Sequence, residues 1–340
     1  MLSTPRTPRV TATVAAGASV VLLAGACGET GGQDANGEWA PEQPIELVAP
    51  AETGGGWDQL ARTSERVLVD NELVEQDVQV ENKPGGGGAI GWSYVDSAND
   101  PHRLFVTSPP ILLVPLAGES DHGHNDFTPL AGLATEYMTF AVPDDSPVQS
   151  FDDLVQRISE DPESVSVAGG SAPGSMDHVA LAGAVQAAGG DPTELNYIPY
   201  DGGGEAMTQM VGGHVDAVAS GAAEAAPMVE SGDARLLAVT APEPVDSLPD
   251  TPTLQEEGID YDFNIWRGVM GPGDMTDEQV AYYDRIFAEM VETEDWQQEA
   301  ENLGWEQSYM DSEEFGEFLD ESYAESAEVL DEVGLRGDQG

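Results

Sequence analysis

The chain has 340 residues, with 11 Lys or Arg against 64 Asp or Glu, and a formal net charge of −53 at pH 7. Hydrophobic residues make up 40% of it, which is enough for two domains with their own cores and argues against wholesale disorder. Proteins bind nucleic acids and anionic lipid headgroups through basic patches. A chain this acidic is therefore not expected to bind either. Repulsion at this charge is largely screened at about 1 M salt. The composition therefore favours a salt-adapted exterior, with an ordinary acidic secreted protein as the alternative.

The first 26 residues have the pattern of an export signal. Arg6 and Arg9 precede an apolar stretch, residues 10–24, that is too short and too weakly apolar to span a membrane. The stretch runs into LLAGAC, which ends at Cys27, the only cysteine of the sequence. This pattern resembles a bacterial lipoprotein signal, so we expect cleavage before Cys27 and lipidation of Cys27. Ordinary cleavage nearby, leaving a free thiol, is the alternative. Residues 27–40 are rich in Gly and polar residues and predict a flexible tether.

Strand-like and helix-like segments alternate after the tether, which predicts an α/β fold with parallel sheets. The predicted strands are 45–49, 78–80, 104–107, 130–134, 139–142, 165–168, 196–198, 215–218, 236–240 and 266–270. The predicted helices are one containing residues 60–68, then 89–97, 151–159 with Ser150 as its N-cap, 178–188, 205–211, 223–231, 276–292, 296–303 and 312–333.

The chain changes character near Pro143 and again near Pro242. We therefore predict a first domain that starts with residues 41–142, a second domain over 143–240, and a return of 241–340 to the first domain with C-terminal helices. Two crossings between the domains would form a hinge around a cleft.

Two glycine loops stand between a predicted strand and a predicted helix. The first is TGGGWD at 53–58, and the second is GGSAPGS at 169–175. Glycines allow close backbone approach, and a helix start presents free N–H groups and a partial positive charge to an anion. Ser171 and Ser175 add hydroxyl donors to the second loop. Either loop alone is explained as a tight turn, but the pair in matching positions predicts a site for a carboxylate.

Several motifs occur in an order that resembles a known family. They are PAETGGGWDQLAR at 50–62, VENKPGGGGAIG at 80–91, GGSAPGSMDH at 169–178, YIPYDGGGEAM at 197–207, GGHVDAVASG at 212–221, and LPDTPTLQEEGID with WRGVMGP within 248–272. Together they resemble the extracytoplasmic substrate-binding proteins of tripartite tricarboxylate transporters, the Bug-type receptors.

The resemblance implies a two-domain periplasmic-binding-protein fold of type II, the Venus flytrap, with a ligand cleft between domains. It implies a small carboxylate ligand, a di- or tricarboxylate or related organic acid, and membrane permease subunits as partners. It implies no cofactor and no catalytic residue. From the LLAGAC pattern we expect attachment to the membrane by the lipid anchor only, on the outer face of the cell membrane. We also expect a monomer.

The ligand-binding residues that the resemblance implies come from both glycine loops, from the loop after strand 196–198 and from two strand ends. They are Thr53, Gly54, Gly55, Gly56, Trp57, Asp58, Ser108, Ser171, Gly174, Ser175, His178, Tyr200, Gly202 and Ser220. Trp57 stands where many members of the family have threonine, and Glu52 where a small residue is common.

Several of these side chains, and two cations beside the motifs, have plainer interpretations. Asp58 is explained equally well as a cap of its own helix, and Arg62 as its partner one turn later. Trp57 is a pocket wall or a core residue. Lys83, the only lysine, and Arg267 lie beside family motifs. Lys83 is a steering charge at the cleft or a surface residue near Glu81.

Three other functions are weighed against the receptor. Ser175 and His178 lie at i and i+3, but no G-x-S-x-G string surrounds Ser175, which disfavours an exported serine hydrolase. Asp121, His122, His124 and Asp126 contain metal-binding residue types, although a solvated loop explains them better. A receptor that feeds a two-component sensor is the alternative within binding proteins.

Overall fold

A computed structural model of the chain describes residues 32–33 and 38–337. The expected leader, Cys27 and most of the expected tether lie outside the described residues. No helix in the described part combines the length and the apolar character that a membrane crossing requires.

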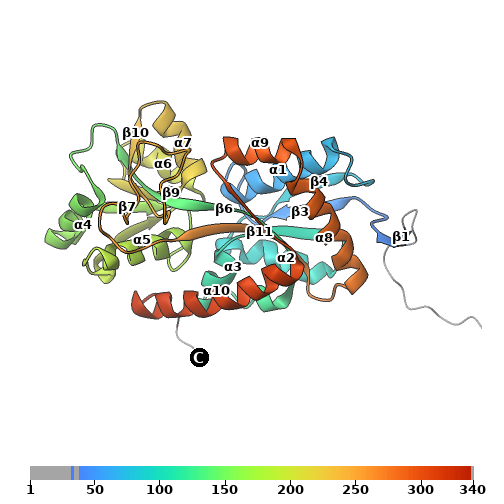
Figure 1. The fold of residues 1–340 in the computed structure, drawn as a ribbon. Coiled ribbons are helices and arrows are strands. Elements are labelled where there is room, and N and C mark those ends of the chain that lie inside the picture. The colour runs from blue at the N-terminus through green and yellow to red at the C-terminus, as the bar shows by residue number, and fades with distance from the viewer. Residues whose placement is uncertain (1–31, 34–37, 338–340) are drawn as a thin grey trace, which may run out of the picture. The chain divides into compact units, whose positions relative to one another are not determined.

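A ten-stranded sheet forms the middle of the described chain (Figure 1). Its strands pair in the order β4-β3-β5-β11-β6-β9-β7-β8, and β10 and β12 also pair with β6. Their bounds are β3 (Ile45–Ala49), β4 (Val78–Asn82), β5 (Arg103–Thr107), β6 (Phe127–Pro143), β7 (Ser166–Gly169), β8 (Asn196–Pro199), β9 (Ala217–Gly221), β10 (Ala234–Val239), β11 (Asn264–Pro272) and β12 (Glu306–Met310). A short ribbon of β1 (Gly32–Gln33) and β2 (Trp39–Ala40) precedes the sheet.

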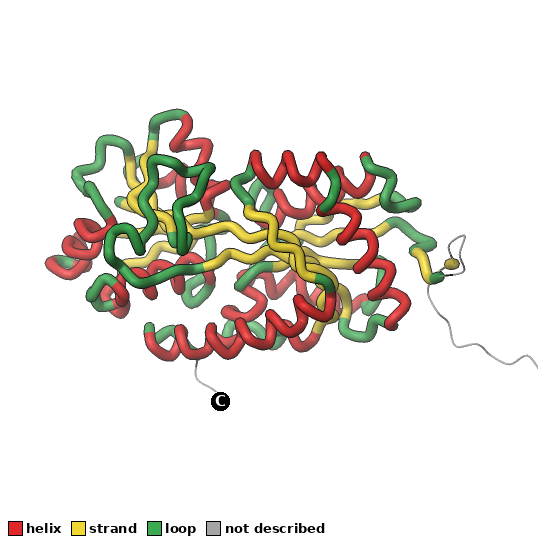
Figure 2. The backbone as a smooth tube through the Cα atoms, in the orientation of Figure 1, coloured by secondary structure: helices red, strands yellow, loops and turns green. Residues whose placement is uncertain are grey.

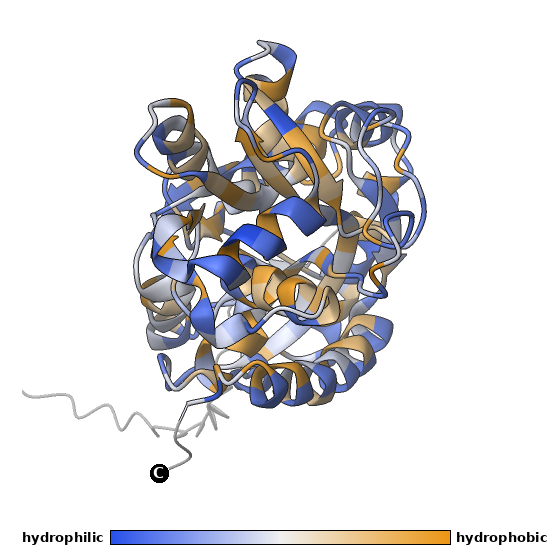
Figure 3. Ribbon diagram, turned by 90° about the vertical axis from the view of Figure 1, so that its left-hand side faces the viewer, coloured by the Kyte–Doolittle hydropathy of each residue, from blue (hydrophilic) through white to orange (hydrophobic). Residues whose placement is uncertain are grey.

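Helices lie on both sides of the strands (Figure 2). They are α1 (Gly56–Asp70), α2 (Ala89–Ala98), α3 (Pro110–Leu116), α4 (Phe151–Glu160), α5 (Met176–Ala187), α6 (Gly203–Val211), α7 (Ala222–Glu230), α8 (Asp277–Val291), α9 (Glu294–Asn302) and α10 (Ser312–Glu332), with a 3-10 turn, η1 (Gly86–Gly88), before α2. Figure 3 shows hydrophilic and hydrophobic segments side by side on these helices, as expected where one face packs on a sheet. Helix α4 buries Phe151, Leu154, Val155 and Ile158, and Ser150 Oγ accepts the Asp153 N–H at 3.1 Å as the predicted N-cap.

Strand β6 divides the sheet into two halves. Residues 127–137 of β6 pair with β11, and residues 138–141 pair with β9. The first half contains the parallel strands β3, β4 and β5, and the second contains the parallel strands β7, β8 and β9. Because the strands of each set run parallel, their carboxyl ends lie at one edge of the sheet, and helices connect one strand to the next.

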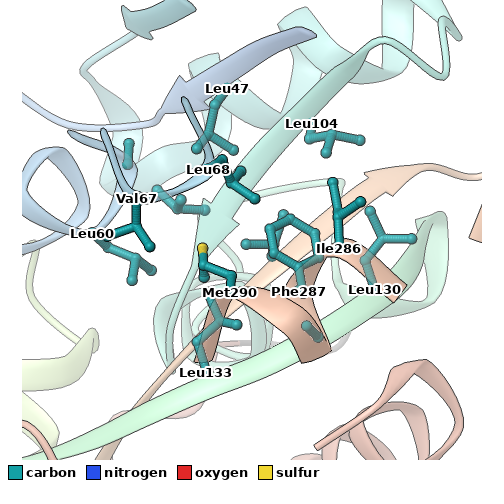
Figure 4. Packing of buried hydrophobic residues seen from close by; sticks show 14 of the residues in the cluster. Leu47, Leu60, Val67, Leu68, Leu104, Leu130, Leu133, Ile286, Phe287 and Met290 are labelled. Carbon is teal, nitrogen blue, oxygen red and sulfur yellow. The ribbon is translucent and has the colours of Figure 1, made fainter. Parts of the chain in front are cut away.

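Each half has its own hydrophobic core. In the first half, Leu60, Val67 and Leu68 of α1 pack with Ile286, Phe287 and Met290 of α8 over Leu47, Leu104, Leu130 and Leu133 of the sheet (Figure 4). Helix α8, from the C-terminal part of the chain, therefore packs on the half that contains the first strands. The second half is centred on Phe140, Phe151, Val167 and Leu181. The domain boundaries given above stay a prediction.

The structure differs from the sequence prediction at four places. Within the expected tether, Gly32–Gln33 pair with Trp39–Ala40, and Trp39 is buried in the core of the first half. The predicted strands 130–134 and 139–142 are parts of one 17-residue strand, β6. Helix α3 was not among the predicted helices, since it begins at two prolines shortly after the strand that ends at Thr107. Proline fits the first helical position, where its missing N–H has no partner to lose. Strand β12 was not predicted, because its residues Glu306–Met310 show no clear apolar alternation.

Candidate functional site

A cavity of about 450 Å3 lies where the carboxyl-terminal loops of the two halves meet. The first half contributes residues from the loops after β3, β4 and β5. The second half contributes residues from the loops after β7 and β8, together with Glu224 of α7. Arg267 of β11 also lines the cavity. Ligand sites of open α/β sheets lie outside the carboxyl ends of the strands, and this cavity occupies that place in both halves.

The start of α1 presents free amides at this cavity. Gly54 adopts a φ of +92°, a left-handed conformation that favours glycine, and Gly55 is the N-cap. The N–H groups of Gly56 and Trp57 have no hydrogen-bond partner among the residues that the structure describes. Both residues line the cavity. The positive end of the 15-residue helix is therefore open to an anion.

The start of α5 repeats this arrangement on the other half. Ser175 is the N-cap, and the N–H of Met176 has no partner within the described ranges. The Ser175 side chain is 1% exposed, and its Oγ has no hydrogen-bond partner there either. Ser175 and Met176 both line the cavity. A buried hydroxyl without a partner is costly, so Ser175 Oγ fits a donor to a bound molecule.

One buried cation stands at the base of the cavity. Arg267 is 3% exposed, and its Nη2 lies 2.5 Å from Oε1 of Glu136, which is fully buried. The indole N–H of Trp305 donates to Glu136 Oε2 at 2.8 Å. Arg267 Nε has no partner in the described part of the molecule. A Cβ on Gly56 would lie 2.7 Å from Arg267 Nη2, so a side chain there would require the guanidinium that pairs with Glu136 to shift.

Two of the acids that line the cavity, Asp177 and Glu224, have raised pKa values. Burial and the neighbouring charge of Glu224 raise the pKa of Asp177 to about 7, against opposing hydrogen bonds from Ser171 and the Gly170 N–H. Burial and the charge of Glu136 raise the pKa of Glu224, while Arg267, Ser220 and Gly203 lower it. The cavity therefore combines open helix starts with acidic side chains.

Comparison with known proteins places this geometry in a family. Residues 65–335 match the model described as "Tripartite tricarboxylate transporter family receptor". The chain belongs to this receptor family. A relative from Cupriavidus necator, named "UPF0065 protein in gbd 5'region", is 28% identical over 301 residues, which is 87% of this chain and 89% of the relative.

Solved structures share the receptor's fold. Rpa4515 of R. palustris, solved with adipate, is 24% identical with a TM-score of 0.80, and the match covers 87% of this chain and 99% of that protein. MatC of Rhodopseudomonas palustris, solved with bound malate, is 20% identical with a TM-score of 0.76, covering 85% and 99%. The α/β periplasmic-binding-protein fold, with a cavity between two halves, agrees with the expected fold class.

The structure brings eight of the expected site residues of this receptor to the cavity. They are Gly55, Gly56, Trp57, Ser108, Ser171, Ser175, Tyr200 and Gly202. Trp57 combines both of its interpretations. It packs against the core clusters of the first half, and its Nε1–H donates to Ser108 Oγ at 2.9 Å. That bond fixes the ring as a wall of the cavity.

Six expected residues do not line the cavity: Thr53, Gly54, Asp58, Gly174, His178 and Ser220. Asp58 instead braces its own loop, because its carboxylate accepts hydrogen bonds from Gly54 N–H, Arg62 and Asn82. Burial raises the pKa of Asp58, but these hydrogen bonds outweigh it and hold the pKa below its usual value.

His178 and Ser220 support neighbouring groups. His178 Nδ1 accepts the Gly174 N–H at 3.1 Å, and its ring stacks on Tyr197 with centroids 4.4 Å apart. Burial lowers the pKa of His178 to about 4, which keeps the imidazole neutral. Ser220 Oγ donates to Glu224 Oε2 at 3.2 Å. Both residues thus support groups next to the cavity without lining it themselves.

The other charged residues that the sequence singled out make local contacts in the structure. Arg62 pairs with Asp58 at 2.9 Å, and Lys83 pairs with Glu81 at 2.7 Å outside the cavity lining. His124 lies 3.3 Å from Asp320. Within the described ranges, no three His, Cys, Asp or Glu side chains are grouped to hold a metal ion.

Several lining residues were not among the expected site residues, and three of these features differ in the signal they gave. The loop Gly85–Gly88 carried a signal, since its glycine run follows a predicted strand in the same way as TGGGWD. Asp177 lies inside the motif GGSAPGSMDH, next to the expected His178. Glu224 had no local signal, because only the tertiary structure places the start of α7 beside α6.

Proposed function

We propose that this receptor binds a small carboxylate, a di- or tricarboxylate or related organic acid, and delivers it to membrane permease subunits of a tripartite transporter. One observation carries the proposal: open amides at the starts of α1 and α5 and the unpartnered hydroxyl of Ser175 line one cavity. A buried carboxylate needs several hydrogen bonds, and these donors supply them with little cationic help. The bound malate and adipate of the two structural neighbours support this ligand class.

We also propose that the receptor is a monomer held on the outer face of the cell membrane by lipid on Cys27. In this proposal the tether lies within residues 27–40 and ends before Trp39, which packs in the first core, and the halves move as domains with the predicted boundaries 142/143 and 240/241. The acidic surface would be an adaptation to salt. The family model supports the extracytoplasmic place, and the LLAGAC pattern supports the anchor.

The serine hydrolase alternative finds no support in the site. A nucleophilic serine needs a base within hydrogen-bond reach. Ser175 Oγ has no partner in the described chain, and His178 Nδ1 is occupied by Gly174 N–H. A sensor-coupled receptor would bind the same ligand and differs only in its protein partner.

Calorimetry with succinate, malate, adipate and citrate in high salt tests the proposal. We expect saturable binding at one site, with the ligand chemically unchanged. Gly55→Val should weaken that binding about tenfold or more, because the new side chain narrows the cavity at the start of α1. Its Tm should change by only a few degrees, since a Cβ on Gly55 would have no atom closer than 3.6 Å and φ is −76°.

The matched control is Gly204→Ala, on α6 outside the cavity lining, where a Cβ has no neighbour within 4 Å. It should leave affinity unchanged. Equal affinities for wild type and Gly55→Val would remove the α1 loop from the site. Turnover of an ester or amide that is lost in Ser175→Ala would instead support the hydrolase.

A further inference from the structure

We propose that Asp177 and Glu224, the acid pair, form a subsite for a hydrogen-bond donor of the ligand. The receptor would then prefer carboxylates that also carry a hydroxyl or ammonium group over plain carboxylates of the same length. This inference rests on the proposed function and names the chemistry of the ligand more closely.

Glu224 reaches across the cavity between the two halves. Its Oε1 accepts the Gly203 N–H at 3.2 Å, and its Oε2 accepts Ser220 Oγ–H at 3.2 Å. A Cβ on Gly55 would lie 4.0 Å from Glu224 Oε1. The carboxylate of the second half therefore stands close to the start of α1, beside the amides that we assign to the ligand's carboxylate.

Asp177 stands in the first turn of α5, directly after Met176. It is 3% exposed, and its backbone N–H donates to Ser171 Oγ at 3.1 Å. The side chain lines the same cavity as Glu224, and the two acids are near enough for the charge of Glu224 to raise the pKa of Asp177.

The acid pair is not neutralised by the nearby cation. Arg267 is already paired with Glu136, so the cavity holds more carboxylate charge than guanidinium charge. Each carboxylate oxygen carries two lone pairs, and the few protein donors to the acid pair leave some of them free. Above about pH 7, where Asp177 is mostly ionised, a second ligand carboxylate placed there would bring only acceptors and a like charge into a low-dielectric site. An O–H or N–H of the ligand would instead be accepted.

Ser175 gives a second, independent indication that the cavity offers donors in one part and acceptors in another. Its buried, unpartnered Oγ lines the cavity and can donate to a carboxylate together with the open amides of α1 and α5. The donors thus account for the acidic end of the ligand. The acid pair, which offers acceptors, accounts for a neighbouring donor group.

Matched ligands test this subsite in the intact receptor. Malate and succinate differ by one hydroxyl group, and aspartate and succinate differ by one ammonium group. Citrate and tricarballylate give a hydroxyl pair of larger size. We expect at least one donor-bearing ligand to bind about tenfold or more tightly than its plain partner, since hydrogen bonds to charged groups have this strength. Tighter binding of malate or citrate than of their plain partners would show that the subsite takes a hydroxyl group. Tighter binding of aspartate than of succinate would show that it takes an ammonium group.

The variants Glu224→Gln and Asp177→Asn separate the subsite from the rest of the cavity. Either should reduce the preference to about threefold or less while affinity for the plain acid stays equal or rises. If plain and donor-bearing acids bind wild type equally, the subsite is refuted while the proposed function stands. If none of the five acids binds, the proposed function itself fails. Because the wild-type comparison decides alone, a variant that fails to fold does not obscure the result.

Discussion

Replacing Arg267 with methionine should lower the free energy of unfolding by about 3–5 kcal/mol, the usual cost of removing one partner of a buried ion pair. Glu136 is fully buried, and its charge is balanced by Arg267 at 2.5 Å. Without the guanidinium, Glu136 keeps only the Trp305 N–H and lies near the charge of Glu224. Urea unfolding at fixed salt measures the loss.

The control is Arg157→Met, which breaks the exposed pair with Asp153 at 2.9 Å and should cost about 1 kcal/mol or less. The double variant Arg267→Met with Glu136→Gln should regain much of the lost stability, because no buried charge is left alone. Equal losses for Arg267→Met and Arg157→Met would show that the buried pair does not hold the base of the cavity together.

Asp177→Asn should stabilise the unliganded receptor at pH 8 and leave it almost unchanged at pH 4. The pKa of Asp177 is raised in the fold to about 7 from 3.8, so its stabilising contribution is complete below about pH 4 and is lost as the pH rises through 7. The difference between these pKa values corresponds to on the order of 4 kcal/mol as an upper figure. Asparagine cannot ionise, so the variant does not lose stability in this way as the pH rises.

Urea unfolding of both proteins at pH 4, 6 and 8 in about 2 M salt measures the effect, because surface repulsion is then screened. Asp153→Asn is the control. A hydrogen bond from Arg157 and one from the Gln149 N–H hold the pKa of Asp153 below its usual value, so this variant should be slightly less stable than wild type at pH 8. If the free energies of unfolding of Asp177→Asn and wild type differed by the same amount at all three pH values, the pKa of the buried Asp177 carboxyl would not be raised as we describe.

The sequence predicted those features that depend on neighbouring residues. Glycine runs between an apolar strand and an amphipathic helix indicated both loops of the cavity, and Ser175 and Trp57 lie at it as expected. Ser150 caps α4 as its position before an amphipathic segment indicated. These signals are local, since backbone conformation and capping are set within a few residues.

Features that depend on the tertiary structure could not be predicted in this way. Glu224 and Gly55 are far apart in the chain, and only the pairing of β9 and β11 with β6 brings their elements together. Arg267 could be marked as a cation beside a motif, but its partner Glu136 lies on a different strand. Asp58 and His178 belong to the right motifs, yet their side chains brace the loops rather than line the cavity.

A crystal structure with the tightest-binding acid of the calorimetric panel tests the central claim most directly. We expect a ligand carboxylate oxygen within about 3.2 Å of the amide nitrogens of Gly56 or Trp57, and another near Met176 N or Ser175 Oγ. The same molecule would thus connect the starts of α1 and α5. A ligand bound elsewhere, or one held in the cavity while those amides contact only water, would contradict the account.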